Sequence, residues 1–126
     1  MNASRELELT VRRMNREQLD ALVSGYNWDD GLELMWRVVE HPACDLGTAI
    51  RVFWLASPFG LWDSDEPKDP RLDYLATLLD RISRCDFATR LIRVDPLSEG
   101  YIPNRVWVRK LRQMGVPHVV LDGTPE

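Results

Sequence analysis

The sequence contains only two cysteines, at positions 44 and 85, and their spacing matches no metal-binding motif. A chain of 126 residues buries roughly two-thirds of its unfolded surface, so it needs no disulfide to be stable. No apolar run approaches the ~20 residues that span a bilayer, and residues 1–14 carry too many charges for a signal peptide. We therefore expect a single domain over residues 1–126, two reduced and semi-buried thiols, and a cytoplasmic location without membrane contact.

Lysine is also scarce, because the chain has two lysines against 14 arginines, and its formal net charge is −4. This acidic balance argues against a general nucleic-acid binder, which needs a basic face to contact phosphates. Charge is unevenly distributed along the chain. Residues 58–70 carry four acids against one lysine, whereas residues 103–115 carry four cations and no acid. The sequence predicts one acidic rim and one basic stripe.

The common catalytic motifs are missing as well: there is no glycine-rich phosphate loop, no G-x-S-x-G and no H-E-x-x-H. We expect no cofactor and a non-enzymatic role. The alternative is a small enzyme that uses His41 and Cys44, because imidazole titrates near neutral pH and a helix N-terminus lowers the pKa of a thiol. Against it, Cys85 and Asp86 repeat the Cys-Asp pair without a histidine, which favours a packing role.

The first helix that the sequence predicts covers residues 16–24. Asn15 offers an N-cap, and Gln18, three residues later, completes a capping box. Gly25 ends the helix. Residues 4–14 have apolar positions that fit a strand and a helix equally well, and both alternatives stay open.

Residues 26–56 predict a tight helical hairpin. We expect Asn27 to cap its first helix and Pro42 to stop it, since the residue before a proline is pushed out of the helical region. Asp45 then caps a second helix that is apolar almost all round. This second helix should be the most buried element of the fold.

An offset of 41 residues aligns the two halves of the chain without a gap. The period resembles that of HEAT-like helical pairs, so we expect two stacked hairpins, residues 26–56 and 71–94, in an all-α fold. The second arm of the second hairpin, residues 86–94, fits either a short helix or an extended segment. The identical pairs are Leu34 and Leu75, Cys44 and Cys85, Asp45 and Asp86, and Thr48 and Thr89.

A last helix is predicted over residues 103–115, where Gly115 ends it. Trp107, Leu111 and Met114 recur at helical spacing and mark this helix. Residues 119–121 then form a short extended or docked tail.

The polar residues around the first hairpin could form an oxygen-rich metal site, but helix capping explains nearly all of them. Asp29 and Asp30 would lie in the first turn of a helix, where the dipole favours acids. His41 would contact carbonyl groups at the helix end. We therefore expect no metal. The residues concerned are Asn27, Asp29, Asp30, His41 and Asp45.

A partner-binding surface is expected in the loop of residues 57–70. Trp62 lies there with Phe59 and is followed by Asp63, Asp65 and Glu66. An aromatic anchor with a charged rim is typical of a binding hot spot, although the loop could instead cover an edge of the core. The partner we expect is another protein, with a basic toxin as the candidate. The basic stripe of residues 105–112 leaves RNA as the alternative partner.

The first hairpin resembles a bacterial family called domain of unknown function 4274. The pattern runs N-W-D-D-G, then H-P-x-C-D-x-G-T-A, then an aromatic-rich helix, and it covers residues 26–56 closely. The resemblance implies no catalytic residues and no activity. It does suggest a context, since small proteins of this kind are often encoded beside toxins as immunity proteins. The matching residues are Asn27, Trp28, Asp29, Asp30, Gly31, His41, Pro42, Cys44, Asp45, Gly47, Thr48 and Ala49.

Overall fold

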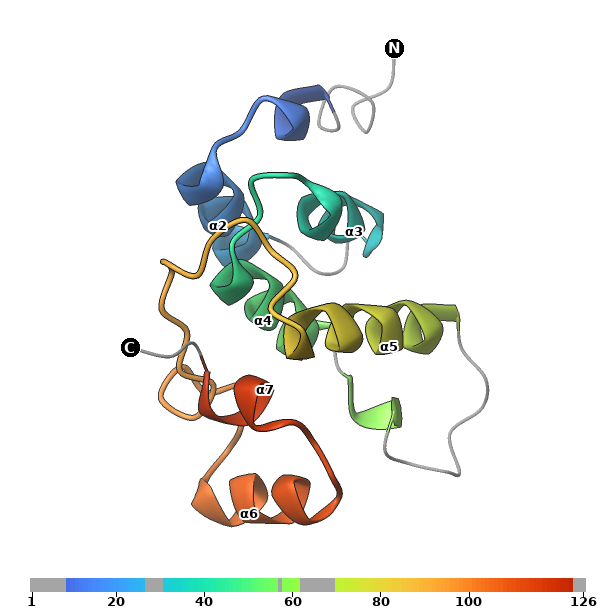
Figure 1. Cartoon of the computed structure of the whole chain (residues 1–126), viewed down its shortest axis with the longest axis vertical. Helices are drawn as coiled ribbons and strands as arrows, with labels where there is room; N and C mark the ends of the chain where they lie inside the picture. Colours follow the sequence, from blue (N-terminus) through green and yellow to red (C-terminus); the bar gives the residue numbers. More distant parts are fainter. Residues whose placement is uncertain (1–8, 27–30, 57, 62–69, 124–126) are drawn as a thin grey trace.

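The computed structural model describes residues 9–26, 31–56, 58–61 and 70–123, and every regular element in these ranges is helical (Figure 1). Ahead of α2, residues 9–12 form one helical turn, which answers the choice between strand and helix for the described part of residues 4–14. The all-α prediction is confirmed. The elements are α2 (Arg16–Gly25), α3 (Glu33–Glu40), α4 (Leu46–Leu55), the 3-10 helix η2 (Pro58–Leu61), α5 (Pro70–Ser83), α6 (Arg105–Gln113) and α7 (His118–Asp122).

Helix α4 is the element around which the others pack. Residues 46–50 and 52–54 are all buried, as expected for a helix that is apolar almost all round. It contacts α2, α3, η2 and α5. Trp54 adds a polar link from its far end, because its indole N–H donates to the Val120 carbonyl of α7 at 2.7 Å. The prediction that α4 is the most buried helix is therefore confirmed.

Helix starts follow the capping residues in two cases and depart from them in a third. Asn15 and Gln18 form the expected capping box of α2, with both bonds at 2.9 Å. Asp45 caps α4. The expected start of α3 at Asn27 is wrong, since α3 begins at Glu33 after Leu32, which makes no side-chain cap. Gly31 explains the delay, because its φ of +95° cannot belong to a right-handed helix.

Helix α5 ends in a Schellman motif. The Asp86 N–H donates to the Arg81 carbonyl at 2.9 Å, and the Cys85 N–H donates to the Ile82 carbonyl at 3.0 Å. Cys85 has a φ of +52°, the left-handed conformation that this motif requires and that glycine adopts without strain. Cys85 is also exposed, so the expectation that both thiols are semi-buried is wrong for this residue.

Residues 86–94 are extended rather than helical, so the predicted second hairpin has only one helical arm, α5. The segment crosses the start of α4, where Asp45 and Thr89 form an isolated parallel bridge. Asp45 and Asp86 therefore occupy different environments, although the repeat pairs them. The HEAT-like repeat itself stays a prediction.

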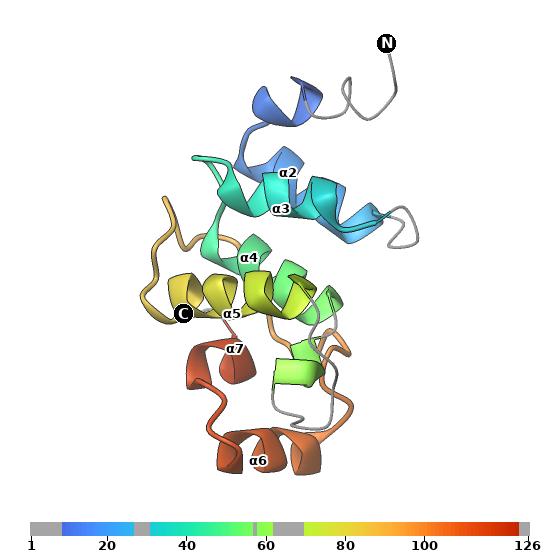
Figure 2. The same ribbon diagram turned by 90° about the vertical axis from the view of Figure 1, so that its right-hand side faces the viewer.

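The C-terminal region forms a pair of helices, α6 followed by α7, at the end of the molecule opposite α2 and α3 (Figures 1 and 2). Helix α6 starts at its cap Asn104 and ends before Gly115, close to the expected bounds. The residues expected as a short tail form α7, in which Val120 and Leu121 are buried. Helix α7 packs on α5, whereas the main helical neighbour of α6 is α7.

The left-handed backbone of Cys85 predicts whether a substitution there stabilises or destabilises the fold. We expect Cys85→Gly to raise the free energy of unfolding by about 0.5–1 kcal/mol, because glycine relieves the strain at C′ and loses part of the gain to its freer unfolded chain. Thermal unfolding followed by circular dichroism measures the change. Cys85→Ala is the control, since it removes the thiol and keeps the Cβ. Equal stability of the glycine and alanine variants would contradict the strain at this position.

Candidate functional site

His41 ends α3 and links the turn before α4 to the N-terminal helical turn. Its Nδ1 accepts the Ala43 N–H at 2.9 Å, and its Nε2 lies 3.2 Å from the Arg12 carbonyl oxygen. A neutral imidazole has one acceptor nitrogen and one donor nitrogen, so this geometry assigns the proton to Nε2. Both ring nitrogens are therefore used in backbone contacts. The expected carbonyl contact is present, but the carbonyl belongs to Arg12 rather than to α3.

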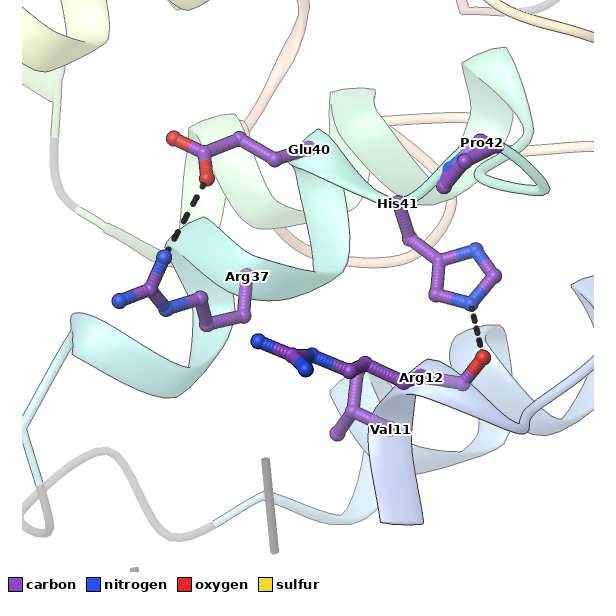
Figure 3. Close-up of a pocket in the computed structure, with 6 residues that line it drawn as sticks. All are labelled: Val11, Arg12, Arg37, Glu40, His41 and Pro42. Atoms are coloured by element: carbon purple, nitrogen blue, oxygen red, sulfur yellow. Dashed lines mark hydrogen bonds and ion pairs between the residues drawn. The ribbon is translucent and has the colours of Figure 1, made fainter. Parts of the chain in front are cut away.

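A small cavity of about 190 Å³ lies beside this ring (Figure 3). The imidazole edge points at the Arg12 backbone, and Arg37 pairs with Glu40 at 3.8 Å on the other side (Figure 3). The volume is below the roughly 300–1,000 Å³ of usual ligand pockets. This arrangement ties two segments together and presents no free base to the cavity. Its lining residues are Val11, Arg12, Arg37, Glu40, His41 and Pro42.

Cys44 is buried, with 1% of its surface exposed, and its Sγ lies 3.5 Å from the Asp45 carbonyl oxygen. Burial raises the pKa of the thiol from 9.0 to about 12, so the group is protonated at neutral pH. The unfolded thiol ionises first, and its contribution to stability is lost as the pH rises from about 9 to about 12. With both nitrogens of His41 engaged elsewhere, the geometry does not assemble a reactive Cys-His pair.

The Asp45 carboxylate is fully buried and holds two parts of the chain together. One oxygen, Oδ1, accepts the Gly47 N–H at 2.8 Å, which is the predicted helix cap, and the Ile92 N–H at 3.1 Å. The other oxygen, Oδ2, accepts the Leu91 N–H at 2.7 Å and the Thr89 hydroxyl at 2.5 Å. Both oxygens act only as acceptors, which is the role of an ionised carboxylate. Asp45 is therefore a cap and a docking point at once.

Gly47 lets the extended segment approach this helix start. A Cβ added at Gly47 would lie 2.1 Å from the Ile92 carbonyl oxygen, which is closer than any real contact allows. The Leu46 N–H donates to the Thr89 carbonyl at 2.9 Å and completes the junction. Asp45 and Gly47, two residues apart, thus share one structural role: together they accommodate residues 89–92.

A second polar cluster, which sequence reasoning missed, lies one turn further along α4. The buried Thr48 hydroxyl donates to Oδ1 of Asp20 at 2.9 Å, and Arg51 Nε lies 3.2 Å from the same oxygen. Arg51 also pairs with Glu99 and contacts the Tyr101 hydroxyl at 3.2 Å. The cluster joins α2 and the loop of residues 95–101 to α4. Its only sequence signal was that Thr48 and Arg51 are three residues apart, on one face of a helix.

Two groups of predicted residues lie outside the described ranges. They are the first half of the family pattern, Asn27, Trp28, Asp29 and Asp30, and most of the expected partner surface, Trp62, Asp63, Asp65 and Glu66. Phe59 lies in η2. Within the described ranges, no three residues among histidine, cysteine, aspartate and glutamate are grouped to hold a metal ion. None of the described helices has the length and apolar character that crossing a membrane requires.

Helix α6 and its C-cap residue Met114 expose apolar side chains, including two of the three whose spacing predicted this helix. Leu111 alone of the three is buried, whereas Trp107 is 41% exposed and Met114 is 52% exposed. Val106 is 57% exposed on the same helix, and the Lys110 ammonium lies 5.1 Å above the Trp107 ring. Besides the buried Leu111, Val108 is half-buried against the core, so α7 and its neighbours cover one strip of α6. Helix α6 thus carries an uncovered apolar surface.

Residues 14–84 match the family model described as a domain of unknown function, DUF4274. The match covers more than half of the 126 residues. The chain belongs to the DUF4274 family. No curated protein and no solved structure matches it. The DUF4274 span includes α2 to α5 with the Asp45 carboxylate, and it stops before residues 89–92 and before α6.

Removing the buried acceptor should be costly. We expect Asp45→Ala to lower the free energy of unfolding by about 3–5 kcal/mol, because the Gly47, Leu91 and Ile92 N–H groups lose their acceptor. Asp86→Ala is the matched control at the position that the 41-residue offset pairs with it. Asp86 is exposed, and its carboxylate forms one long ion pair with Arg81 at 3.8 Å. Removing it should therefore lower the free energy of unfolding by less than ~1 kcal/mol. Urea denaturation measures both, and similar costs would contradict the docking role.

The two thiols should differ sharply in reactivity. We expect Cys85 to react rapidly with Ellman's reagent in the folded protein and Cys44 to react only on unfolding, because Cys44 is buried and protonated. Absorbance during labelling in buffer and in urea measures the two rates. In a Cys85→Ser variant the fast phase should disappear. A fast phase that persists in this variant at neutral pH would restore Cys44 as a candidate nucleophile.

Proposed function

We propose that this DUF4274 chain is a non-enzymatic protein-binding module that neutralises a bacterial toxin as an immunity protein. One observation carries the proposal: among the described residues, three of the five exposed large apolar side chains lie on α6 or at its C-cap. They are Val106, Trp107 and Met114. Tryptophan and methionine are enriched in the buried centres of protein interfaces. The surface formed by these three residues is therefore suited to binding a partner protein.

The position of α6 supports the same role. Helix α7 is its main helical neighbour, and both views place it at one end of the molecule (Figures 1 and 2). The Lys110 ammonium lies above the Trp107 ring, and an exposed cation–π contact of this kind stabilises the ring position by about 0.5–1 kcal/mol. A partner can therefore cover the outer side of α6 without displacing another described helix.

In the first hairpin, the two side chains that could be reactive already have structural roles, which supports a binding role over an enzymatic one. His41 and Cys44 were the residues of the enzyme alternative, and each has a structural partner. The His41 imidazole donates to the Arg12 carbonyl, and burial raises the pKa of the Cys44 thiol. Fully used polar groups of this kind stabilise a fold and leave little capacity for chemistry.

A second contact region remains part of this proposal. The loop residues Phe59, Trp62, Asp63, Asp65 and Glu66 would meet a basic surface of the toxin. An aromatic side chain among acids suits such a surface, because apolar burial supplies affinity and opposite charges guide association.

The test compares variants of α6 and its C-cap with an exposed apolar residue elsewhere. We expect Trp107→Ala with Met114→Ala to weaken the captured partner by about 30-fold or more, since interface tryptophans often contribute ~2 kcal/mol. Leu91→Ala is the control, because Leu91 is 67% exposed and lies outside α6. Protein retained from the native host by immobilised wild type is identified, and its dissociation constants are measured by biolayer interferometry. Melting curves check that all variants are folded.

The immunity role adds a cellular outcome. Expression of the captured partner alone should stop growth, and co-expression of the wild-type chain should restore it. Equal retention of the partner by wild type and the Trp107/Met114 variant would contradict binding through α6. A partner that is harmless when expressed alone would contradict the toxin-neutralising role.

A further inference from the structure

An open groove of about 530 Å³ runs along the other side of α6. Val108 and Leu97, both half-buried, provide its apolar part, and guanidinium groups surround them. Helical spacing places Val108 on one side of the buried Leu111 and Trp107 on the other, so this groove differs from the apolar surface described above. Its lining residues are Leu97, Arg105, Val108, Arg109, Arg112 and Asp122.

The charges of the groove are unbalanced. Asp122 is its only acid and is already paired with Arg112 at 2.9 Å. Arg105 and Arg109 have no ion pair among the described residues. They are four residues apart on one helix, where like charges repel and destabilise the helix by a few tenths of a kcal/mol. An incoming carboxylate would remove this repulsion.

We propose that this groove binds an acidic segment of a partner protein, in which carboxylates alternate with apolar side chains. The inference rests on the proposed protein-binding function and adds the chemistry of the partner. Carboxylates would accept paired hydrogen bonds from Arg105 and Arg109, since the planar guanidinium matches them. The alternating apolar side chains would bury against Val108 and Leu97. Both halves of the groove, charged rim and apolar floor, are then used.

A protein segment fits this groove better than a nucleic acid does. Nucleic-acid binding draws its affinity from many phosphate contacts, whereas the groove offers two arginines without an ion pair on a chain of net charge −4. Bases bind single-strand sites by stacking on aromatic rings, and the groove lining has none. The aliphatic floor of Val108 and Leu97 instead suits leucine-like side chains.

The experiment uses the full chain and a fluorescein-labelled peptide in which glutamates alternate with leucine and serine. Fluorescence anisotropy should show saturable binding that Arg109→Glu weakens about tenfold or more, because one charge-assisted pair is replaced by repulsion. Arg90→Glu is the control, since Arg90 is exposed outside the groove and the variant has the same net charge. The same peptide with glutamine in place of glutamate should bind at least about tenfold more weakly.

Several outcomes would overturn the groove assignment. They are the absence of saturable peptide binding, equal loss in Arg109→Glu and Arg90→Glu, and stronger binding of an oligouridylate of similar length. The captured host partner separates this inference from the proposed function. If Trp107→Ala with Met114→Ala weakens its capture while Arg109→Glu does not, the groove assignment fails and the binding module stands. If the peptide binds as expected but no α6 variant changes capture, the groove stands and the proposed function fails.

Discussion

The buried carboxylate of Asp45 is the interaction on which the rest of the structure depends. Its two oxygens accept four hydrogen bonds, one from the start of α4 and three from residues 89–92. A helix start has N–H groups that need acceptors, and an extended segment with no sheet partner has the same need. One side chain meets both needs away from water, where such bonds are strong and their loss is costly. The central helix and the segment that leads to the C-terminal helices are thereby fixed to each other.

Local signals in the sequence predicted the elements that depend on local contacts. The capping box of α2, the Asp45 cap and the apolar circumference of α4 each lie within a few neighbouring residues, and each was confirmed. The start of α3 was predicted wrongly because the prediction rested on the capping residue Asn27 alone, whereas the positive φ of Gly31 decides the backbone there. The positive φ of a single glycine therefore outweighs the helix-forming tendency of the residues before it.

Contacts between distant residues were not accessible in this way. The offset of 41 residues aligned Thr89 with Thr48 as equivalent positions of a repeat. In the structure they have different partners, since Thr89 bonds to Asp45 and Thr48 bonds to Asp20. On α6 the spacing of Trp107, Leu111 and Met114 predicted a helix. It could not show which of these side chains α7 and its neighbours would cover, because coverage depends on packing. The exposed apolar surface of α6 therefore came from the structure, whereas the basic residues of the same helix were already visible in the sequence as the stripe of residues 105–112.

The junction at Gly47 has a consequence for where this unit can be cut. Residues 14–84 match the family model, yet the peptide that fills the space beside Gly47 comes from residues 89–92. A fragment trimmed to the matched span would leave the buried Asp45 carboxylate with a single bonded donor, the Gly47 N–H. We therefore expect a stable fragment to extend past the boundary drawn by sequence similarity and to retain residues 89–92, which cross the start of α4.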